Sequence, residues 1–230
     1  MRVQMRIIIF MGLPYQGKTT AAKLLYGAMC ASKKYQNREV KYISTDIERS
    51  RVLRECFPRQ ETFGYSQEEE TLAWKSFIGA IFEFINCSPT NSILILDGTF
   101  TEWSKLCELF DTLTVNLDMY ASQRLPLIID LVHIGSQYGE KVWKPTELNL
   151  LKDDEVRYAW QNRCQYNKAL GIASRIDDSV FNRKLQELRA TLKVLVPTCK
   201  HFMTSYKGLI YFARHFLPHH PQPELIYKLL

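Results

Sequence analysis

Short apolar runs along the chain predict its strands. Arg6–Met11 and Ile93–Asp97 consist almost wholly of large apolar residues, Leu127–Ile134 is similar, and Val40–Ser44 is a shorter mixed run. Continuous apolar runs of this length, rich in β-branched residues, are typical of strands buried on both faces of a parallel sheet. The pattern therefore predicts four strands.

Between and after these runs, apolar residues recur with helical spacing. The clearest stretch is Glu68–Ile85, and Ser66 with Glu69 forms a capping box at its start. Two stretches rich in basic residues, Asp153–Ala173 and Phe181–Val194, are also predicted to be helices. A further helix is expected after the Gly-rich loop that follows the first strand, on the spacing of Ala21, Leu24, Leu25 and Ala28.

Strands that alternate with helices predict an α/β fold with a doubly wound, mostly parallel sheet. No repeat or linker divides the 230 residues, so one domain is expected. Its core would span about residues 5–135, and a helical lid with C-terminal helices would span about 150–217.

Composition narrows the class of protein. No apolar run reaches the roughly 18 residues of a spanning helix, and the apolar start leads into a Gly-rich loop rather than a signal-peptide cleavage site. The six cysteines are scattered without a CxxC pair, which fits reduced thiols better than a zinc site or a disulfide framework. These features predict a cytoplasmic protein without a membrane segment.

The net charge of +6 is unevenly placed. From Arg157 to Arg214 the sequence has eleven Lys and Arg but only three acidic residues. This stretch therefore has a net charge of +8, which leaves about −2 for the rest of the chain. A basic region beside a phosphate site favours an anionic substrate. The alternative is that these side chains only keep helical surfaces soluble.

One motif indicates nucleotide binding. Gly12-Leu-Pro-Tyr-Gln-Gly17-Lys18-Thr19 matches the Walker A pattern G-x-x-x-x-G-K-[ST] at every fixed position. Its backbone N–H groups and the following helix terminus attract phosphates, Lys18 is expected to reach the β- and γ-phosphates, and Thr19 is expected to hold Mg²⁺. The other expected nucleotide contacts are Gly12, Tyr15, Gln16, Gly17 and Thr20. A Gly-rich turn without a ligand is the alternative interpretation.

A second candidate for the phosphate site ends the third apolar run. Ile93-Leu-Ile-Leu-Asp97 is apolar up to an acid at the carboxyl end of the predicted strand, where ligands of open α/β sheets bind. Asp97 is expected to orient the Mg²⁺ shell. A helix-capping role for Asp97 is the alternative.

Other P-loop classes fit less well than small kinases. Motor and AAA-type ATPases need further modules, and small GTPases carry an N-K-x-D motif. The nearest string here, Asn167-Lys-Ala-Leu, lacks the Asp. Small kinases, which transfer the γ-phosphate to an acceptor, remain.

Four phrases then carry a family resemblance. They are Met11-Gly-Leu-Pro-Tyr-Gln-Gly-Lys-Thr-Thr20, Ser44-Thr-Asp46-Ile-Glu-Arg49, Phe63-Gly-Tyr-Ser-Gln-Glu and Ile95-Leu-Asp97-Gly-Thr-Phe100. Together they resemble the P-loop kinases that include polynucleotide 5′-hydroxyl kinases, zeta-toxin-like kinases and small predicted kinases. The resemblance covers about residues 5–135 and fades beyond them.

The resemblance implies that Asp46 is the general base and that Arg49 grips an anionic group of the acceptor. A carboxylate near the acceptor is useful because an alcohol is a poor nucleophile, and an Arg one helical turn away can point into the same cleft. The alternatives are that Asp46 caps the next helix and that Arg49 pairs with Glu48 or is solvated.

Kinases of this kind also close a helical lid that brings arginines to the γ-phosphate. Arg163 is the first candidate, with Arg157 and Arg175 in reserve, and each is alternatively a surface arginine. Tyr15 and Gln16 depart from the family's usual Gly-Ser. Loop geometry or acceptor contacts can differ there, for example by stacking of Tyr15 on a base or sugar.

The expected function is Mg²⁺-dependent transfer of the γ-phosphate of ATP, with GTP not excluded, to a hydroxyl. The basic region favours a phosphate-bearing acceptor, such as a nucleotide, an oligonucleotide or a modified nucleic acid. The alternatives are a kinase of a neutral small molecule or sugar nucleotide and, from another class, an NTP-dependent switch or binding protein. The sequence does not indicate an oligomeric state.

Overall fold

The computed structural model describes residues 5–14, 18–56, 67–89, 91–120, 128–133, 157, 160–161, 164–165, 178–198 and 202–204. Its strands are β1 (Arg6–Met11), β2 (Val40–Ser44), β3 (Ile93–Asp97), β4 (Ile128–His133) and β5 (Phe202–Thr204). They form one sheet in the order β2-β3-β1-β4-β5. All four strand pairings in this sheet are parallel.

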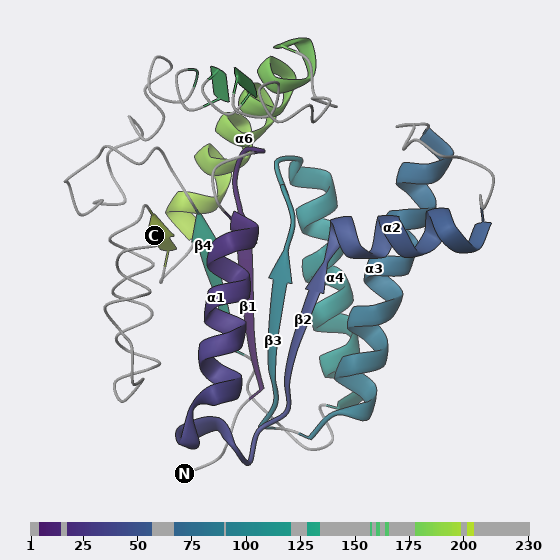
Figure 1. The fold of residues 1–230 in the computed structure, drawn as a ribbon, viewed down its shortest axis with the longest axis vertical. Helices are drawn as coiled ribbons and strands as arrows, with labels where there is room; N and C mark the ends of the chain where they lie inside the picture. The colour runs from purple at the N-terminus through teal and green to yellow at the C-terminus, as the bar shows by residue number, and fades with distance from the viewer. Residues whose placement is uncertain are drawn as a thin grey trace.

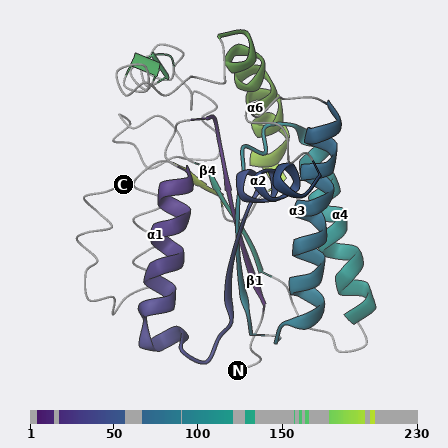
Figure 2. The ribbon, with the colours of Figure 1, turned by 45° about the vertical axis from the view of Figure 1, so that its right-hand side comes forward.

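Helices cover both faces of the sheet (Figures 1 and 2). Helix α1 (Lys18–Ala31) lies on one face, and α3 (Gln67–Cys87) and α4 (Trp103–Tyr120) lie side by side on the other. Helices α2 (Thr45–Cys56) and α6 (Asp178–Thr198) lie toward the carboxyl ends of the strands. A 3₁₀ turn at Lys33–Tyr35 leads from α1 toward β2. The predicted doubly wound α/β fold is confirmed.

The alternation of side chains along the strands builds two cores. Ile8 and Phe10 of β1 and Ile95 of β3 pack beneath α1, whereas Ile7 and Leu96 join the larger core beneath α3 and α4. Both sets are fully buried, because a central parallel strand is covered on its two faces.

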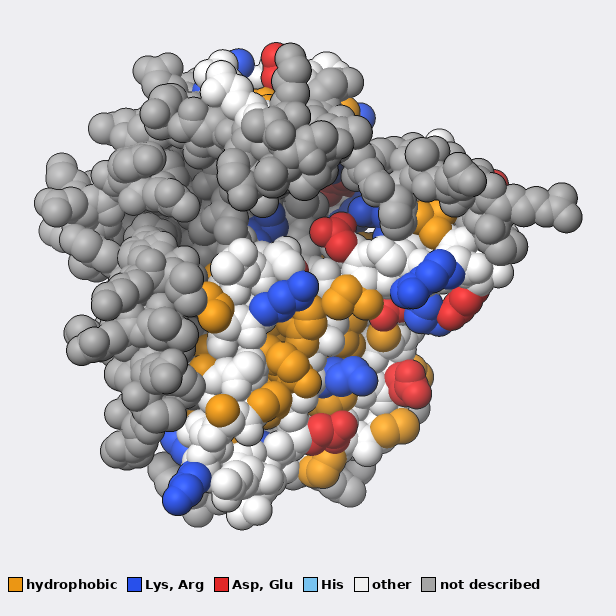
Figure 3. Space-filling view, in the orientation of Figure 1, with side chains coloured by type: hydrophobic (Ala, Val, Ile, Leu, Met, Phe, Trp, Pro, Cys, Tyr) orange, Lys and Arg blue, Asp and Glu red, His pale blue; other side chains and the backbone are white. Residues whose placement is uncertain are grey.

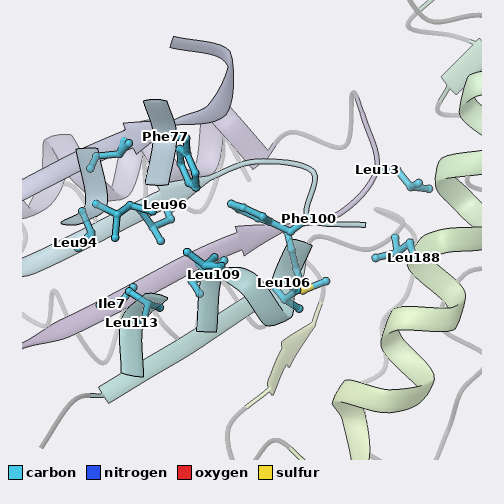
Figure 4. Close-up of a cluster of buried hydrophobic side chains, with 14 of the residues drawn as sticks. Ile7, Leu13, Phe77, Leu94, Leu96, Phe100, Leu106, Leu109, Leu113 and Leu188 are labelled. Carbon is cyan, nitrogen blue, oxygen red and sulfur yellow. The ribbon is translucent and has the colours of Figure 1, made fainter. Parts of the chain in front are cut away.

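The larger core reaches the carboxyl end of the sheet. Figure 4 shows Phe77, Phe100 and Leu106 in this core, with Leu13 and Leu188 together at one end. Leu13 follows β1 and Leu188 belongs to α6, so α6 is packed against the loop that carries the Walker A motif.

The predicted strands and helices compare closely with the observed ones. The first three strands have the predicted bounds, and β4, described over Ile128–His133, lies within the predicted run. The helix predicted over Glu68–Ile85 is α3, and the one predicted over Phe181–Val194 is the longer α6. Residue Ser66 of the capping box and most of Asp153–Ala173 lie outside the described residues. No helix among the described residues is long and apolar enough to cross a membrane.

Candidate phosphate-binding site

The site lies where the strand order reverses. From β1 the chain passes over β3 to β2, and from β3 it passes over β1 to β4, so β1 and β3 flank the switch point of the sheet. Phe10 and Asp97 are register partners at the carboxyl ends of these two strands. Open α/β sheets bind ligands in the crevice outside this position.

The Walker A loop begins with a glycine in a strained conformation. Gly12 has φ 145°, a region that L side chains rarely adopt. Its N–H donates a hydrogen bond of 3.1 Å to the carbonyl oxygen of Thr99, which follows β3. Tyr15, Gln16 and Gly17 lie outside the described residues. Helix α1 begins at Lys18, and the next two residues, Thr19 and Thr20, are exposed at its N-terminus.

Lys18 is buried beside the loop. Its ammonium donates a hydrogen bond of 2.6 Å to the carbonyl oxygen of Leu13. Burial lowers the pKa of Lys18 to about 8, and the charges of Asp97 and Asp46 act in the opposite direction. Lys18 therefore places a buried ammonium within electrostatic reach of Asp97, which ends β3, and of Asp46 in the first turn of α2.

Asp97 is the buried acid of the site. The side chain is 2% exposed, and its Oδ2 accepts a hydrogen bond of 2.7 Å from the hydroxyl of Tyr42. Burial, followed by the hydrogen bond and the charge of Asp97, raises the pKa of Tyr42, so this hydroxyl remains a donor. The other oxygen, Oδ1, is buried and has no hydrogen-bond partner among the residues that the structure describes. Asp97 belongs to β3, and the next helix, α4, begins only at Trp103. Asp97 therefore does not cap a helix, which was the alternative role.

These groups fit Mg²⁺. The ion is usually held by one or two protein oxygens together with phosphates and waters. An unpartnered carboxylate oxygen of Asp97 and the exposed Thr19 at the start of α1 supply that kind of donor set. Among the described residues no group of three or more His, Cys, Asp or Glu could hold a metal by itself.

The turn after Asp97 admits only a glycine without rearrangement. A Cβ on Gly98 would lie 2.8 Å from Cζ of Phe100 and 3.0 Å from Cγ2 of Thr45. Phe100 has a positive φ of 43° and is buried in the larger core. The string Asp97-Gly-Thr-Phe100 therefore brings β3, the Walker A loop and the start of α2 into close contact.

Asp46 and Arg49 lie in the first turns of α2. Asp46 is not the cap of this helix, because its own N–H donates to Oγ of Ser44. The Asp46 side chain is 77% exposed and pairs with Arg49 at 3.2 Å. Arg49 pairs also with Glu70 of α3 at 2.9 Å, whereas Glu48 pairs with Arg51 at 3.0 Å.

Sequence reasoning missed the acidic and basic side chains that continue from Arg49 across the helices. Glu70 lies 3.8 Å from Lys105, which lies 3.9 Å from Glu102, and Glu102 pairs with Lys184 of α6 at 2.7 Å. Charges of both signs are also interspersed over α2 in Figure 3. Except for Glu102 and Lys105, which are three residues apart, these partners come from distant segments of the chain, and no local spacing signals them.

Part of the basic C-terminal region has a structural role. Lys184 binds both Glu102 and Glu187, and although burial opposes it, these hydrogen bonds raise its pKa. Arg157 is exposed and donates to Asn182 of α6. Trp160 is buried and stacks on Phe181, as expected for a core residue. The lid candidates Arg163 and Arg175 lie outside the described residues.

Comparisons with known proteins give structural neighbours only. No family model matches the chain, and no curated protein matches it. Among solved structures, Chaetomium thermophilum Kti12 in complex with ADP-AlF3 is 17% identical, with a TM-score of 0.47 over 79% of each chain.

Two other neighbours are kinases by description. A protein of Chloroflexus aurantiacus assigned provisionally as a kinase is 14% identical, with a TM-score of 0.46 over 89% of this chain and 88% of that one. Thymidylate kinase from Ehrlichia chaffeensis is 18% identical, with a TM-score of 0.33 over 83% of this chain and 97% of that one. At this level of similarity the neighbours assign no activity to the chain.

Proposed function

We propose that the chain is a P-loop phosphotransferase, a kinase that moves the γ-phosphate of ATP, or of GTP, to a hydroxyl acceptor. The observation that carries this proposal is that Lys18 and Asp97 are both buried and lie near enough for their charges to interact. A buried ammonium at the start of α1 acts on a buried carboxylate whose Oδ1 has no partner among the described residues, at the switch point of a parallel sheet. This arrangement suits a nucleotide phosphate and its metal.

The residues have separate roles in the proposed reaction. Backbone N–H groups of Gly12–Thr20 and the ammonium of Lys18 bind the β- and γ-phosphates, whereas Thr19 and Asp97 hold Mg²⁺, which neutralises phosphate charge. The acceptor oxygen attacks the γ-phosphorus, and the bond between that phosphorus and the β,γ-bridging oxygen breaks. The hydroxyl proton passes to Asp46, and the nucleoside diphosphate leaves.

Asp46 is suited to the acceptor side because it is exposed next to the site. Its charge acts on Lys18, yet its carboxylate is 77% open to solvent. A catalytic role of Asp46 would also distinguish a kinase from an NTP-dependent switch, since a switch needs no base beside an acceptor.

Arg49 lies next to Asp46 and has a mostly covered side chain, 19% exposed. With Lys105 on the other side of Glu70, it places two cations on this side of the site. These cations support an acceptor that carries phosphate, such as a nucleotide, an oligonucleotide or a modified nucleic acid. A neutral small molecule or a sugar nucleotide is the alternative acceptor.

The test is phosphate transfer from labelled ATP and GTP, with Mg²⁺, to a panel of hydroxyl acceptors. Lys18→Ala should abolish transfer while the protein keeps its circular dichroism spectrum. The matched control is Lys23→Ala, since Lys23 is exposed on the same helix. Near-wild-type turnover by folded Lys18→Ala protein would overturn the proposal.

A further inference from the structure

One face of the sheet gathers three groups at the phosphate site. Ile93 and Ile95 of β3 pack into the core beneath α1, so Asp97, two residues further, belongs to the same face. Tyr42 packs against this core from β2. Lys18 opens the helix that covers it. The hydroxyl of Tyr42 therefore meets Asp97 on the side of the sheet where the Walker A loop joins α1.

The register of β2 and β3 explains the reach of Tyr42. Ser44 is the partner of Asp97, and Tyr42 is the partner of Ile95, one step along the same face. A tyrosine side chain spans such a diagonal. Its hydroxyl lies 2.7 Å from Oδ2 of Asp97.

We propose that Tyr42 is a positioning residue for the metal-binding carboxylate: its hydroxyl holds Oδ2 of Asp97 and thereby leaves Oδ1 for the shell of a nucleotide-bound Mg²⁺. This inference rests on the proposed function. Within the described part of the chain Oδ1 is buried without a hydrogen-bond partner, although nearly all buried polar atoms have one. A carboxylate with one oxygen held and the other unpartnered cannot turn freely, so its orientation toward a metal is set before the metal binds.

The experiment measures ADP binding to the full chain by calorimetry, with Mg²⁺ and with EDTA. In Tyr42→Phe we expect Mg²⁺ affinity in the ADP complex to fall about 10- to 100-fold, the usual effect of removing a partner of a metal ligand, while ADP affinity in EDTA stays at the wild-type value. Tyr26→Phe is the matched control, because its ring lies 6.0 Å from that of Tyr42, whereas the hydroxyl bound to Asp97 is that of Tyr42. It should behave as wild type.

A second comparison, between Asp97→Asn and the double variant with Tyr42→Phe, distinguishes a positioning role of Tyr42 from a role in the stability of the fold. In an Asp97→Asn background, adding Tyr42→Phe should cause no further loss of Mg²⁺ affinity, because the carboxylate that Tyr42 orients is gone. An equal further loss, or weaker ADP binding in EDTA, would show that Tyr42 only supports the fold and would overturn the inference.

Other outcomes are equally decisive. Wild-type Mg²⁺ affinity in folded Tyr42→Phe overturns the role of Tyr42 and leaves the proposed function intact. Failure of the wild-type chain to bind ADP under either condition overturns the nucleotide site and this inference with it. If Tyr42→Phe does not fold, Tyr42→His, which keeps a ring N–H donor, should retain more Mg²⁺ affinity than Tyr42→Leu, and equal affinities would overturn the inference.

Discussion

The ammonium of Lys18 donates a hydrogen bond of 2.6 Å to the carbonyl oxygen of Leu13, five residues earlier. The contact spans the Walker A loop and buries a charge at the N-terminus of α1, where the helix terminus is itself positive. Burial lowers the pKa of Lys18 from 10.5 to about 8. The protonation of this residue therefore changes within an accessible pH range.

Nucleotide binding should depend on pH through Lys18. Phosphates favour the charged ammonium, so they raise its pKa and draw in a proton. Affinity for ATP should be full below pH 8 and should fall above it, by up to about tenfold per pH unit. Calorimetry at pH 7, 8 and 9 in buffers of different ionisation enthalpy measures both the affinity and the proton uptake. The ATP affinity of Lys18→Arg, which stays charged, should not fall with pH. A wild-type ATP affinity that does not change with pH would show that Lys18 does not bind the phosphates.

Asp46 should act on the chemical step. We expect Asp46→Asn to lower kcat by about 100-fold or more while nucleotide affinity changes little, since general-base losses are of this size. Glu55→Gln, which changes an exposed acid of the same helix away from the site, is the control and should retain wild-type kcat. If nucleotide binding weakens and transfer from bound ATP is unaltered, Asp46 belongs to the metal shell or to the fold.

Gly98 should be required for stability. Gly98→Ala places a methyl group 2.8 Å from the buried ring of Phe100, and overpacking of this kind costs about 1–3 kcal/mol of unfolding free energy. Gly79→Ala on the exposed face of α3 meets nothing within 4 Å and should stabilise by about 0.5–1 kcal/mol. Urea unfolding of both variants gives the comparison. Equal stability would mean that the turn after β3 adjusts without cost.

Thr191 should anchor α6 to the end of β3. Its buried hydroxyl donates a hydrogen bond of 2.7 Å to the carbonyl oxygen of Thr101. Thr191→Val keeps the shape but leaves this carbonyl without the donor, a loss of about 1–3 kcal/mol. Thr71→Val removes an exposed hydroxyl bound to the carbonyl of Gln67 and should change stability by less than about 0.5 kcal/mol. A loss of the same size in both variants would contradict the anchoring role.

Acceptor binding should respond to salt. Eleven basic residues face three acids over Arg157–Arg214, so the KM of a phosphate-bearing acceptor should rise with salt at saturating MgATP. Arg163→Ala should also lower kcat, because a lid arginine acts on the transferring phosphate. A flat salt response would indicate an uncharged acceptor, and an unaltered kcat would leave Arg157 and Arg175 as lid candidates.

Local patterns in the sequence were enough to predict β1 to β4, but not β5. Whether a strand is buried on both faces is visible in its own side chains, and the glycines and lysine of the Walker A motif, whose phosphate binding stays a prediction, have a fixed spacing along the chain. The first three strands accordingly have the predicted bounds. Asp97 was recognised for the same reason, since it ends an apolar run.

The tertiary structure decided which side chains meet at the site. Tyr42 and Asp97 are 55 residues apart and become neighbours because β2 pairs with β3. Glu70 meets Arg49 only through the packing of α3 beside α2. The order of strands in a sheet depends on crossovers between distant segments, and no local periodicity specifies it. Periodicity along the chain thus determined which elements form, and packing across the sheet determined the partner of the Asp97 carboxylate.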